Sequence, residues 1–211
     1  MIPDEIVNLK NYPICDTDIW VDIILAKIDS LLFSKYEKIV IADVVEWEIL
    51  QFQKDEYSKC IAEKYLYYKN RKDIIIINHS DINEEDRKLL EKQLKDCDNR
   101  FQNGLVDFPH EKHKGEIVSA IYAEYLKLSF LKSNDGTFKD GNMGRIAFPD
   151  LVVKDRRDTL MDLVDSERKR KECLQLIIDS RELMNEGTRI YETSTASEEQ
   201  IEKLLRKWKK H

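Results

Sequence analysis

Apolar runs of strand length alternate along this chain with longer segments whose apolar residues recur at helical spacing. The strand-like runs are residues 12–15 (YPIC), 38–43 (KIVIAD), 73–81 (DIIIINHSD) and 129–135 (SFLKSND). Helical patterns occupy residues 20–31, 44–72, 83–94 and 115–128. This alternation predicts an α/β fold with a mostly parallel central sheet and helices on both of its faces. The four consecutive isoleucines at 74–77 predict a strand buried on both faces.

The pattern changes character near Pro149. We expect residues 1–150 to form the α/β domain and residues 151–211 to form a mainly helical C-terminal extension. Near the end of that extension, apolar residues follow the i, i+3, i+4, i+7 pattern of a helix with one apolar face that packs against another surface. That stripe consists of Ile201, Leu204, Leu205 and Trp208. The extension is therefore predicted to pack on the domain or on a partner.

Composition excludes several classes of protein. Only six glycines occur, and none form the GxGxxG or GxxxxGK[ST] loops that cradle phosphates. Four scattered cysteines without a CxxC pair favour reduced thiols over disulfides or a zinc ribbon. The first residues lack a signal-peptide pattern, and no apolar stretch approaches the ~20 residues that span a bilayer. We expect a soluble, cytoplasmic protein without a membrane partner.

Acidic residues lie where the predicted strands end and the following helices begin. Asp16 ends the first strand, and Glu46 and Glu48 lie in the first turns of the helix after the second. Glu116 begins the helix at 115–128, and Asp135 ends the strand after it. Because parallel strands all end at one edge of a sheet, these acids are expected to meet there, where open α/β sheets place ligands.

Crowded carboxylates repel each other unless a cation lies among them. Oxygen ligands without clustered histidine or cysteine suit Mg²⁺ or Mn²⁺ rather than zinc. Such ions activate water and stabilise both oxygens of an in-line phosphodiester displacement. The predicted chemistry is metal-dependent hydrolysis of a phosphate ester.

The quoted motifs resemble those of PIN-domain nucleases. They are "ICDTDIWV", then "VVEWEIL", then "GEIVSAIYAEYL…FLKSND". The resemblance implies a three-layer α/β/α fold and an acidic pocket that binds Mg²⁺ or Mn²⁺. It also implies that Asp16, Glu48, Glu116 and Asp135 are the catalytic and metal-binding acids, with Glu46 as the alternative to Glu48. Asn134 would position a phosphate or a water.

The substrate implied by the resemblance is RNA, with DNA as an alternative. Many members of the family are toxins of toxin–antitoxin pairs, so an antitoxin-like protein inhibitor is one expected partner, and a homo-oligomer is another. The resemblance covers roughly residues 12–140. The chain departs from compact members of the family in its longer stretch between the second and third acids and in its helical tail.

Each acid also has an ordinary structural interpretation. Asp18 is a good helix N-cap, and Glu116 is favourable in a first turn whatever else it does. Asp135 and Gly136 form an ordinary turn dipeptide. His110 and His113 are expected in an exposed loop, not as metal ligands. The basic runs at 168–171 (RKRK) and 206–210 (RKWKK) could contact phosphates but are more simply solvated helix faces.

Two other functions remain open. "ICDTDIWV" also resembles the DxD loop of haloacid-dehalogenase-like phosphatases, in which Asp16 would be the nucleophile and Asp18 the general acid. The Ser or Thr expected after the second strand of that family is absent, because "KIVIAD" ends in Asp43. The third reading is a non-catalytic PIN-like module whose pocket is occluded and whose tail binds a partner.

Overall fold

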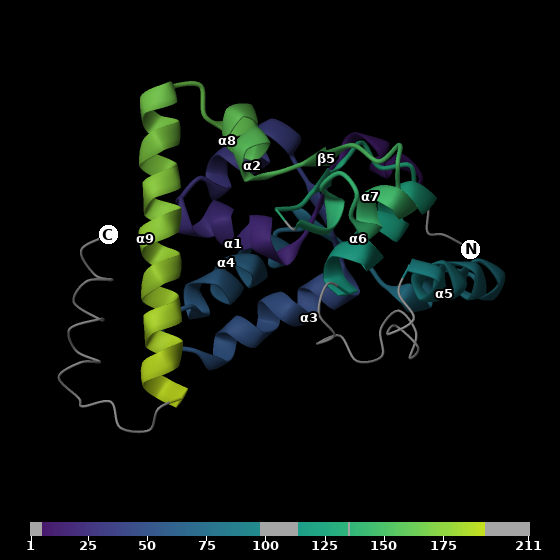
Figure 1. Cartoon of the computed structure of the whole chain (residues 1–211), viewed down its shortest axis with the longest axis horizontal. Coiled ribbons are helices and arrows are strands. Elements are labelled where there is room, and N and C mark those ends of the chain that lie inside the picture. The colour runs from purple at the N-terminus through teal and green to yellow at the C-terminus, as the bar shows by residue number, and fades with distance from the viewer. Residues whose placement is uncertain (1–5, 98–113, 135, 193–211) are drawn as a thin grey trace.

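A five-stranded, all-parallel sheet organises the chain, with strand order β3-β2-β1-β4-β5. The computed structural model describes residues 6–97, 114–134 and 136–192, shown in colour in Figure 1. The strands are β1 (Ile14–Cys15), β2 (Ile39–Ala42), β3 (Ile74–Ile77), β4 (Leu131–Lys132) and β5 (Val153–Lys154). The predicted three-layer α/β/α architecture with a parallel sheet is confirmed.

Helices make up most of the remaining described chain. The α-helices are α1 (Thr17–Leu25), α2 (Asp29–Tyr36), α3 (Asp43–Gln51), α4 (Lys59–Asn70), α5 (Glu84–Cys97), α6 (Lys114–Tyr125), α7 (Met143–Ala147), α8 (Arg156–Leu163) and α9 (Glu167–Glu192). Short 3-10 turns lie at Ile6–Asn11, Phe52–Lys54, His79–Asp81 and Gly136–Phe138. Within these described ranges, no helix combines the length and apolar character needed to cross a membrane.

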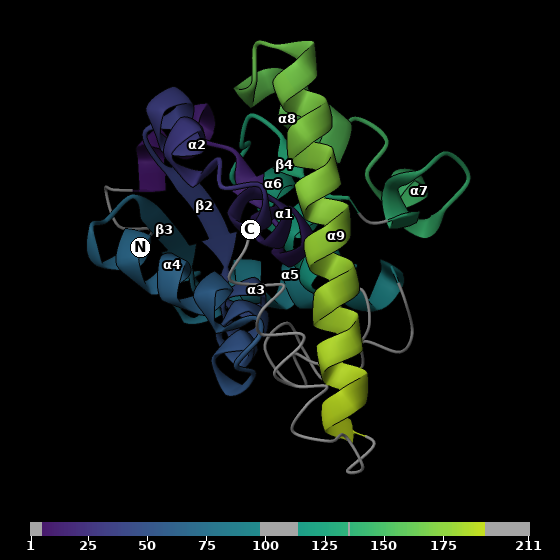
Figure 2. The ribbon, with the colours of Figure 1, turned by 90° about the vertical axis from the view of Figure 1, so that its left-hand side faces the viewer.

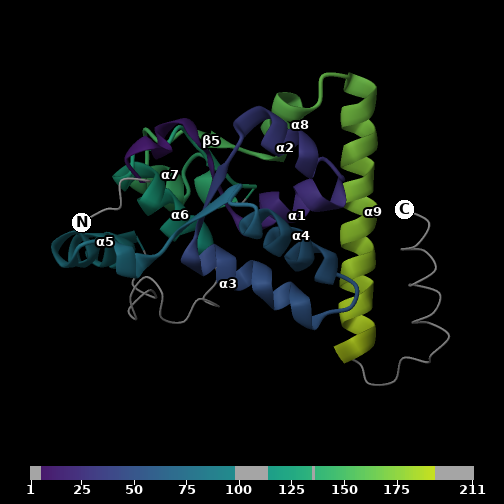
Figure 3. The ribbon, with the colours of Figure 1, turned by 180° about the vertical axis from the view of Figure 1, so that it is seen from behind.

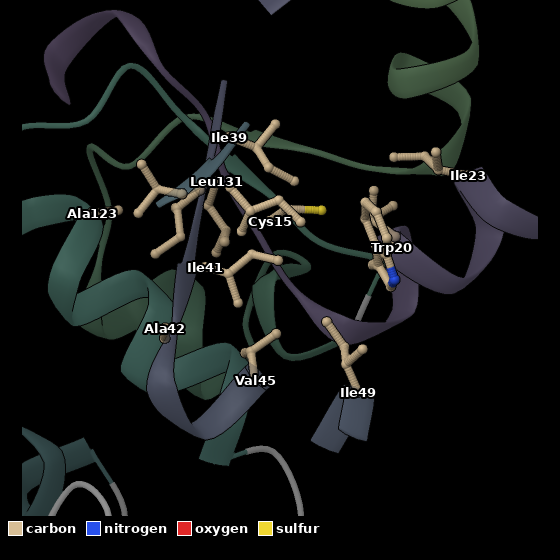
Figure 4. Packing of buried hydrophobic residues seen from close by; sticks show 14 of the residues in the cluster. Cys15, Trp20, Ile23, Ile39, Ile41, Ala42, Val45, Ile49, Ala123 and Leu131 are labelled. Atoms are coloured by element: carbon tan, nitrogen blue, oxygen red, sulfur yellow. The ribbon is translucent and has the colours of Figure 1, made fainter. Parts of the chain in front are cut away.

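The core lies on both faces of the sheet because neighbouring residues of a strand point to opposite sides. Ile14, Val40 and Leu131 are register partners and share the face covered by α6. The next residues along the strands, Cys15 among them, share the opposite face. Figure 4 shows Ala123 of α6 on one side of the strands and Trp20 of α1 on the other. Both faces are therefore filled by helix side chains, as a parallel sheet requires.

One detail of the predicted elements was wrong and another was confirmed only in part. The isoleucine run is buried on both faces only at its ends: Ile74 and Ile77 point to opposite faces and are buried, whereas Ile75 and Ile76 are half-buried because β3 is an edge strand. The long helix predicted over 44–72 is two helices, α3 and α4. Asp55 forms the break, since its carboxylate accepts hydrogen bonds from the Ser58 hydroxyl at 2.5 Å and the Tyr57 amide at 3.2 Å. Such local hydrogen bonds compete with the helix.

The sheet continues past the predicted domain boundary at residue 150. Strand β5 follows that boundary and pairs with β4 in parallel, Leu131 opposite Val153 and Lys132 opposite Lys154. The residues from 151 on are thus first part of the sheet and only then helical. The assignment of 151–211 as a separate extension stays a prediction, and its apolar stripe at 201–208 lies outside the described residues.

Helix α9 is attached to α1 through a buried acid that sequence reasoning did not single out. Asp22 of α1 is 3% exposed and accepts hydrogen bonds from Arg156 Nε at 2.5 Å and from Arg181 Nε at 2.8 Å. Figures 1 and 3 show α9 running along one side of the molecule beside α1. One carboxylate of α1 is therefore bound to both α8 and α9.

Replacing Asp22 by Asn should destabilise the fold by about 3 kcal/mol, because it removes the buried negative charge with which Arg156 and Arg181 pair. Urea unfolding measures the change. Glu167→Gln is the matched control, since Glu167 pairs with Lys171 at 2.8 Å where both side chains are about three-quarters exposed. Its free energy of unfolding should change by less than about 1 kcal/mol. Equal losses in the two variants would contradict this role for Asp22.

Candidate acidic site

The carboxyl edge of the sheet carries a polar residue after each strand. These residues are Asp16 after β1, Asp43 after β2, Asn78 after β3, Ser133 and Asn134 after β4, and Asp155 after β5. Since all strands run in one direction, these residues lie along one edge. Asp16 comes from the central strand of the order 3-2-1-4-5, so it lies in the middle of this edge.

Asp16 is the N-cap of α1 and is only 1% exposed. Its Oδ1 accepts a hydrogen bond from the Ile19 amide at 2.9 Å, whereas its Oδ2 is buried and has no hydrogen-bond partner within the described residues. Burial raises the pKa of this carboxyl well above its usual range, and the charges of Glu116 and Asp18 raise it further. The hydrogen bond from the Ile19 amide and the nearby Ser133 hydroxyl oppose the rise in pKa but do not cancel it.

Glu48 of α3 lies against the start of α1 and the start of α6. The Thr17 hydroxyl donates a hydrogen bond to Glu48 Oε2. A Cβ placed on Gly115 would lie 2.8 Å from Glu48 Oε1, so a larger residue here would push this carboxylate aside. Burial raises the pKa of Glu48 to about 7, helped by the charges of Glu116 and Asp18 and opposed by the Thr17 hydrogen bond.

Glu46 has a different environment. Its Oε1 accepts a hydrogen bond from the Tyr65 hydroxyl at 2.7 Å and forms an ion pair with Lys69. The side chain is thereby committed to α4. Of the two glutamates that the sequence left as alternatives, Glu48 is the one that interacts with Glu116.

Glu116 lies in the first turn of α6, next to Gly115. Its charge acts on both Asp16 and Glu48, which brings the three predicted acids of the described chain into one electrostatic environment. The fourth predicted acid, Asp135, lies outside the described residues, as do His110 and His113. The metal-binding role of each residue stays a prediction.

The described side chains fit a hard cation in part. All donors are oxygens, one oxygen of Asp16 is buried without a partner, and the repulsion among the acids would fall if a cation bound. Within 9–97, 114–134 and 136–185, however, no three residues of the types Asp, Glu, His and Cys form a group close enough to hold an ion. A complete ligand set needs a further oxygen or a movement of these side chains.

Asp18 does not occupy the N-cap position that the sequence suggested for it. Asp16 caps α1 instead, and Asp18 lies in the first turn. Asp18 Oδ1 accepts a hydrogen bond at 3.2 Å from Arg181 Nη2, which also donates to the Asp18 carbonyl at 3.0 Å. The helix begins two residues earlier than expected because β1 ends at Cys15, so Asp16 is the first residue available to cap it.

The basic run at 168–171 lies in the first turns of α9. Arg168 pairs with Glu172 and Lys171 with Glu167, both at i, i+4 spacing. Arg170 turns back to the carbonyl oxygens of Val164 and Asp165 at 2.7 and 2.9 Å. Most of this run therefore is the solvated helix face that the sequence favoured. The second basic run, at 206–210, lies outside the described residues.

Comparisons with known proteins add no relative: no family model, curated protein or solved structure matches this chain. The all-parallel order 3-2-1-4-5 is compatible with Rossmann-like folds, among which the PIN fold is one. The fold therefore agrees with the resemblance noted in the sequence at the level of architecture.

The raised pKa of Glu48 predicts a specific pH dependence of stability. In the folded protein this carboxyl keeps its proton up to about pH 7, whereas in the unfolded chain it ionises near its ordinary pKa of about 4.3. The folded state binds more protons between these values, so stability is present at low pH and is lost as pH rises through about 7. Between about pH 5 and about pH 8, the free energy of unfolding of Glu48→Gln should therefore fall by about 2 kcal/mol less than that of wild type.

Urea unfolding in EDTA at the two pH values measures this difference. Glu46→Gln, two residues away and bound to Lys69, is the control and should keep the wild-type pH dependence. If Glu48→Gln and wild type lose the same stability between the two pH values, Glu48 is not buried as described.

Proposed function

We propose that this chain is a Mg²⁺- or Mn²⁺-dependent nuclease of the PIN kind that hydrolyses phosphodiester bonds of RNA, with DNA as the alternative substrate. The observation that carries the proposal is the buried Asp16 Oδ2, which has no hydrogen-bond partner in the described chain and lies near Glu116 and Asp18, whose charges raise the pKa of Asp16 and of Glu48. A buried carboxylate without a counter-charge is costly, and sites of this kind are commonly functional.

In this proposal Asp16, Glu48 and Glu116 hold the divalent ion, and Asp135 joins them as the resemblance implies. The bound ion would supply a water of lowered pKa and charge stabilisation at the phosphate oxygens. The Thr17 hydroxyl orients Glu48 by donating a hydrogen bond to it. The Ile19 amide fixes the Asp16 carboxylate by donating to Oδ1, which leaves Oδ2 to bind the ion. Asn134, directly after Ser133 at the same edge, would orient a phosphate.

The phosphatase alternative is weakened by Asp18. In that reading Asp18 is a general acid on a loop, but it lies in the first turn of α1 and is bound to Arg181. The occluded-module alternative is favoured by one observation, the near-complete burial of Asp16. An antitoxin-like inhibitor and a homo-oligomer stay predictions.

Cleavage of a quenched fluorescent RNA, beside a DNA of the same sequence, tests the proposal in Mn²⁺, Mg²⁺ and EDTA. We expect metal-dependent cleavage that Asp16→Asn lowers by more than about 100-fold, since loss of groups behind metal ligands already costs about 10–100-fold. Glu48→Gln should also lower the rate strongly.

Asp18→Asn and Glu46→Gln are the controls and should retain most of the activity, because neither carboxylate has a place in the proposed ligand set. Turnover of p-nitrophenyl phosphate that needs both Asp16 and Asp18 would replace the proposal with the phosphatase. Folded protein that cleaves neither RNA nor DNA in either metal would favour the occluded module.

A further inference from the structure

A groove of about 600 Å³ lies between α8 and α9. Figure 2 shows α8 close to the first half of α9, and the two helices are in contact. The groove is lined by both helices and by Asn134. None of the three acids Asp16, Glu48 and Glu116 lines it, and two of its cations, Arg170 and Lys171, belong to the basic run at 168–171.

One end of the groove lies at the carboxyl edge of the sheet. Asn134 follows β4, and the neighbouring lining residues Asp155 and Arg156 follow β5. Strand β4 pairs with β1, whose end carries Asp16, and β5 pairs with β4 on its other side. A chain molecule lying in this groove would therefore reach the edge of the sheet on which the acids gather.

The charge of the groove is opposite to that of the whole protein. Its lining contains four cationic residues (Arg156, Arg157, Arg170 and Lys171) and two acidic ones (Asp155 and Glu167), whereas the chain has a net charge of -6. Asp155 is committed to the capping box of α8. The groove thus offers a local positive surface on an acidic protein, which a polyanion would prefer over the rest of the molecule.

Two of the four cations are available to a ligand. Arg156 is held by Asp22, and Arg170 donates to backbone carbonyls. The side chain of Arg157 is exposed and forms no hydrogen bond or ion pair with any other described residue. Lys171 has only its exposed pair with Glu167 in the described chain, and such pairs exchange at little cost.

The floor between the cations is apolar. Leu160, Met161 and Leu174 line it, and Met161 and Leu174 are 57% and 39% exposed. A cationic rim over an apolar floor suits a strand whose backbone is anionic and whose bases have apolar faces. An acidic peptide would use the rim but leave this floor exposed.

We propose that the groove between α8 and α9 binds the backbone of a single-stranded nucleic acid, with Arg157 and Lys171 contacting phosphates. The strand then leads past Asn134 to the acidic edge, which makes the tail helix α9 part of the substrate-binding surface. The direction of the strand rests on the proposed nuclease function, whereas binding in the groove does not.

Fluorescence anisotropy with a labelled single-stranded RNA of mixed sequence tests the proposal, on full-length protein in EDTA so that nothing is cleaved. The double variant Arg157→Glu/Lys171→Glu should bind at least about 10-fold more weakly than wild type at low salt. The slope of log K against log salt should fall by about 1.4, from two lost phosphate contacts at about 0.7 each.

The matched control is Lys88→Glu/Lys92→Glu on α5, at the other end of the molecule in Figure 1. It changes the net charge equally, and Lys88 pairs with Glu84 at i, i+4 spacing as Lys171 pairs with Glu167. We expect the control to bind within about two-fold of wild type, because its charges lie far from the groove. Both doubles should keep the wild-type circular dichroism.

Equal weakening in the two doubles would overturn the proposal, because it would show only a response to net charge. Binding of polyglutamate but not RNA through Arg157 and Lys171 would overturn it in favour of an acidic protein partner. RNA binding that needs Arg157 and Lys171, without any cleavage, would support this inference and contradict the nuclease. Cleavage that needs Asp16 but is unchanged in Arg157→Glu/Lys171→Glu would support the nuclease and overturn this inference.

Discussion

The parallel direction of all five strands is the constraint on which the rest of the molecule depends. Because the strands run in one direction and are only two to four residues long, the residue after each one lies at the same edge of the sheet. This brings Asp16, Asn134 and Asp155 to neighbouring positions although 139 residues separate the first from the last. The start of α1, the acidic site and the mouth of the α8–α9 groove all follow from that alignment.

Asp22 of α1 and Asp16, the N-cap of α1, are both buried, but within the described residues only one of them has a cationic partner. Asp22 is 3% exposed and is neutralised by Arg156 and Arg181. Asp16 is 1% exposed, and no cationic side chain forms an ion pair with it in the described chain. The counter-charge of Asp22 is thus supplied by α8 and α9. The absence of such a partner for Asp16 is the physical reason to expect that a ligand supplies it.

Much of the fold could be predicted from the sequence because it depends on local patterns. Apolar runs at strand spacing located four of the five strands, and the alternation with helices predicted the parallel sheet. Strand β5 was missed because a two-residue strand next to charged residues has no periodicity. The break at Asp55 was missed because a single turn-forming residue within a charged segment resembles an ordinary helical position.

The candidate site could be predicted only as far as strand ends and the resemblance reach. Asp16 was singled out because it follows an apolar run, and Glu48 because its place before Ile49 and Leu50 matches the helix acid of the resemblance; the role of each stays a prediction. The sequence could not pair Asp22 with Arg156 and Arg181, which lie 134 and 159 residues away. It also could not assemble the groove, whose cations come from two helices and owe their proximity to that same ion-pair cluster.

Titration of the metal-free protein with Mn²⁺, followed by the electron paramagnetic resonance signal of the free ion, tests whether a metal site includes Asp16. We expect wild type and Glu46→Gln to remove Mn²⁺ from solution, and Asp16→Asn to do so at least about 10-fold more weakly. We also expect binding to strengthen as pH rises through about 7, where Glu48 loses its proton. Folded wild-type protein that leaves the Mn²⁺ signal unchanged, or that binds the ion equally well with Asn at position 16, would contradict a metal site that includes Asp16.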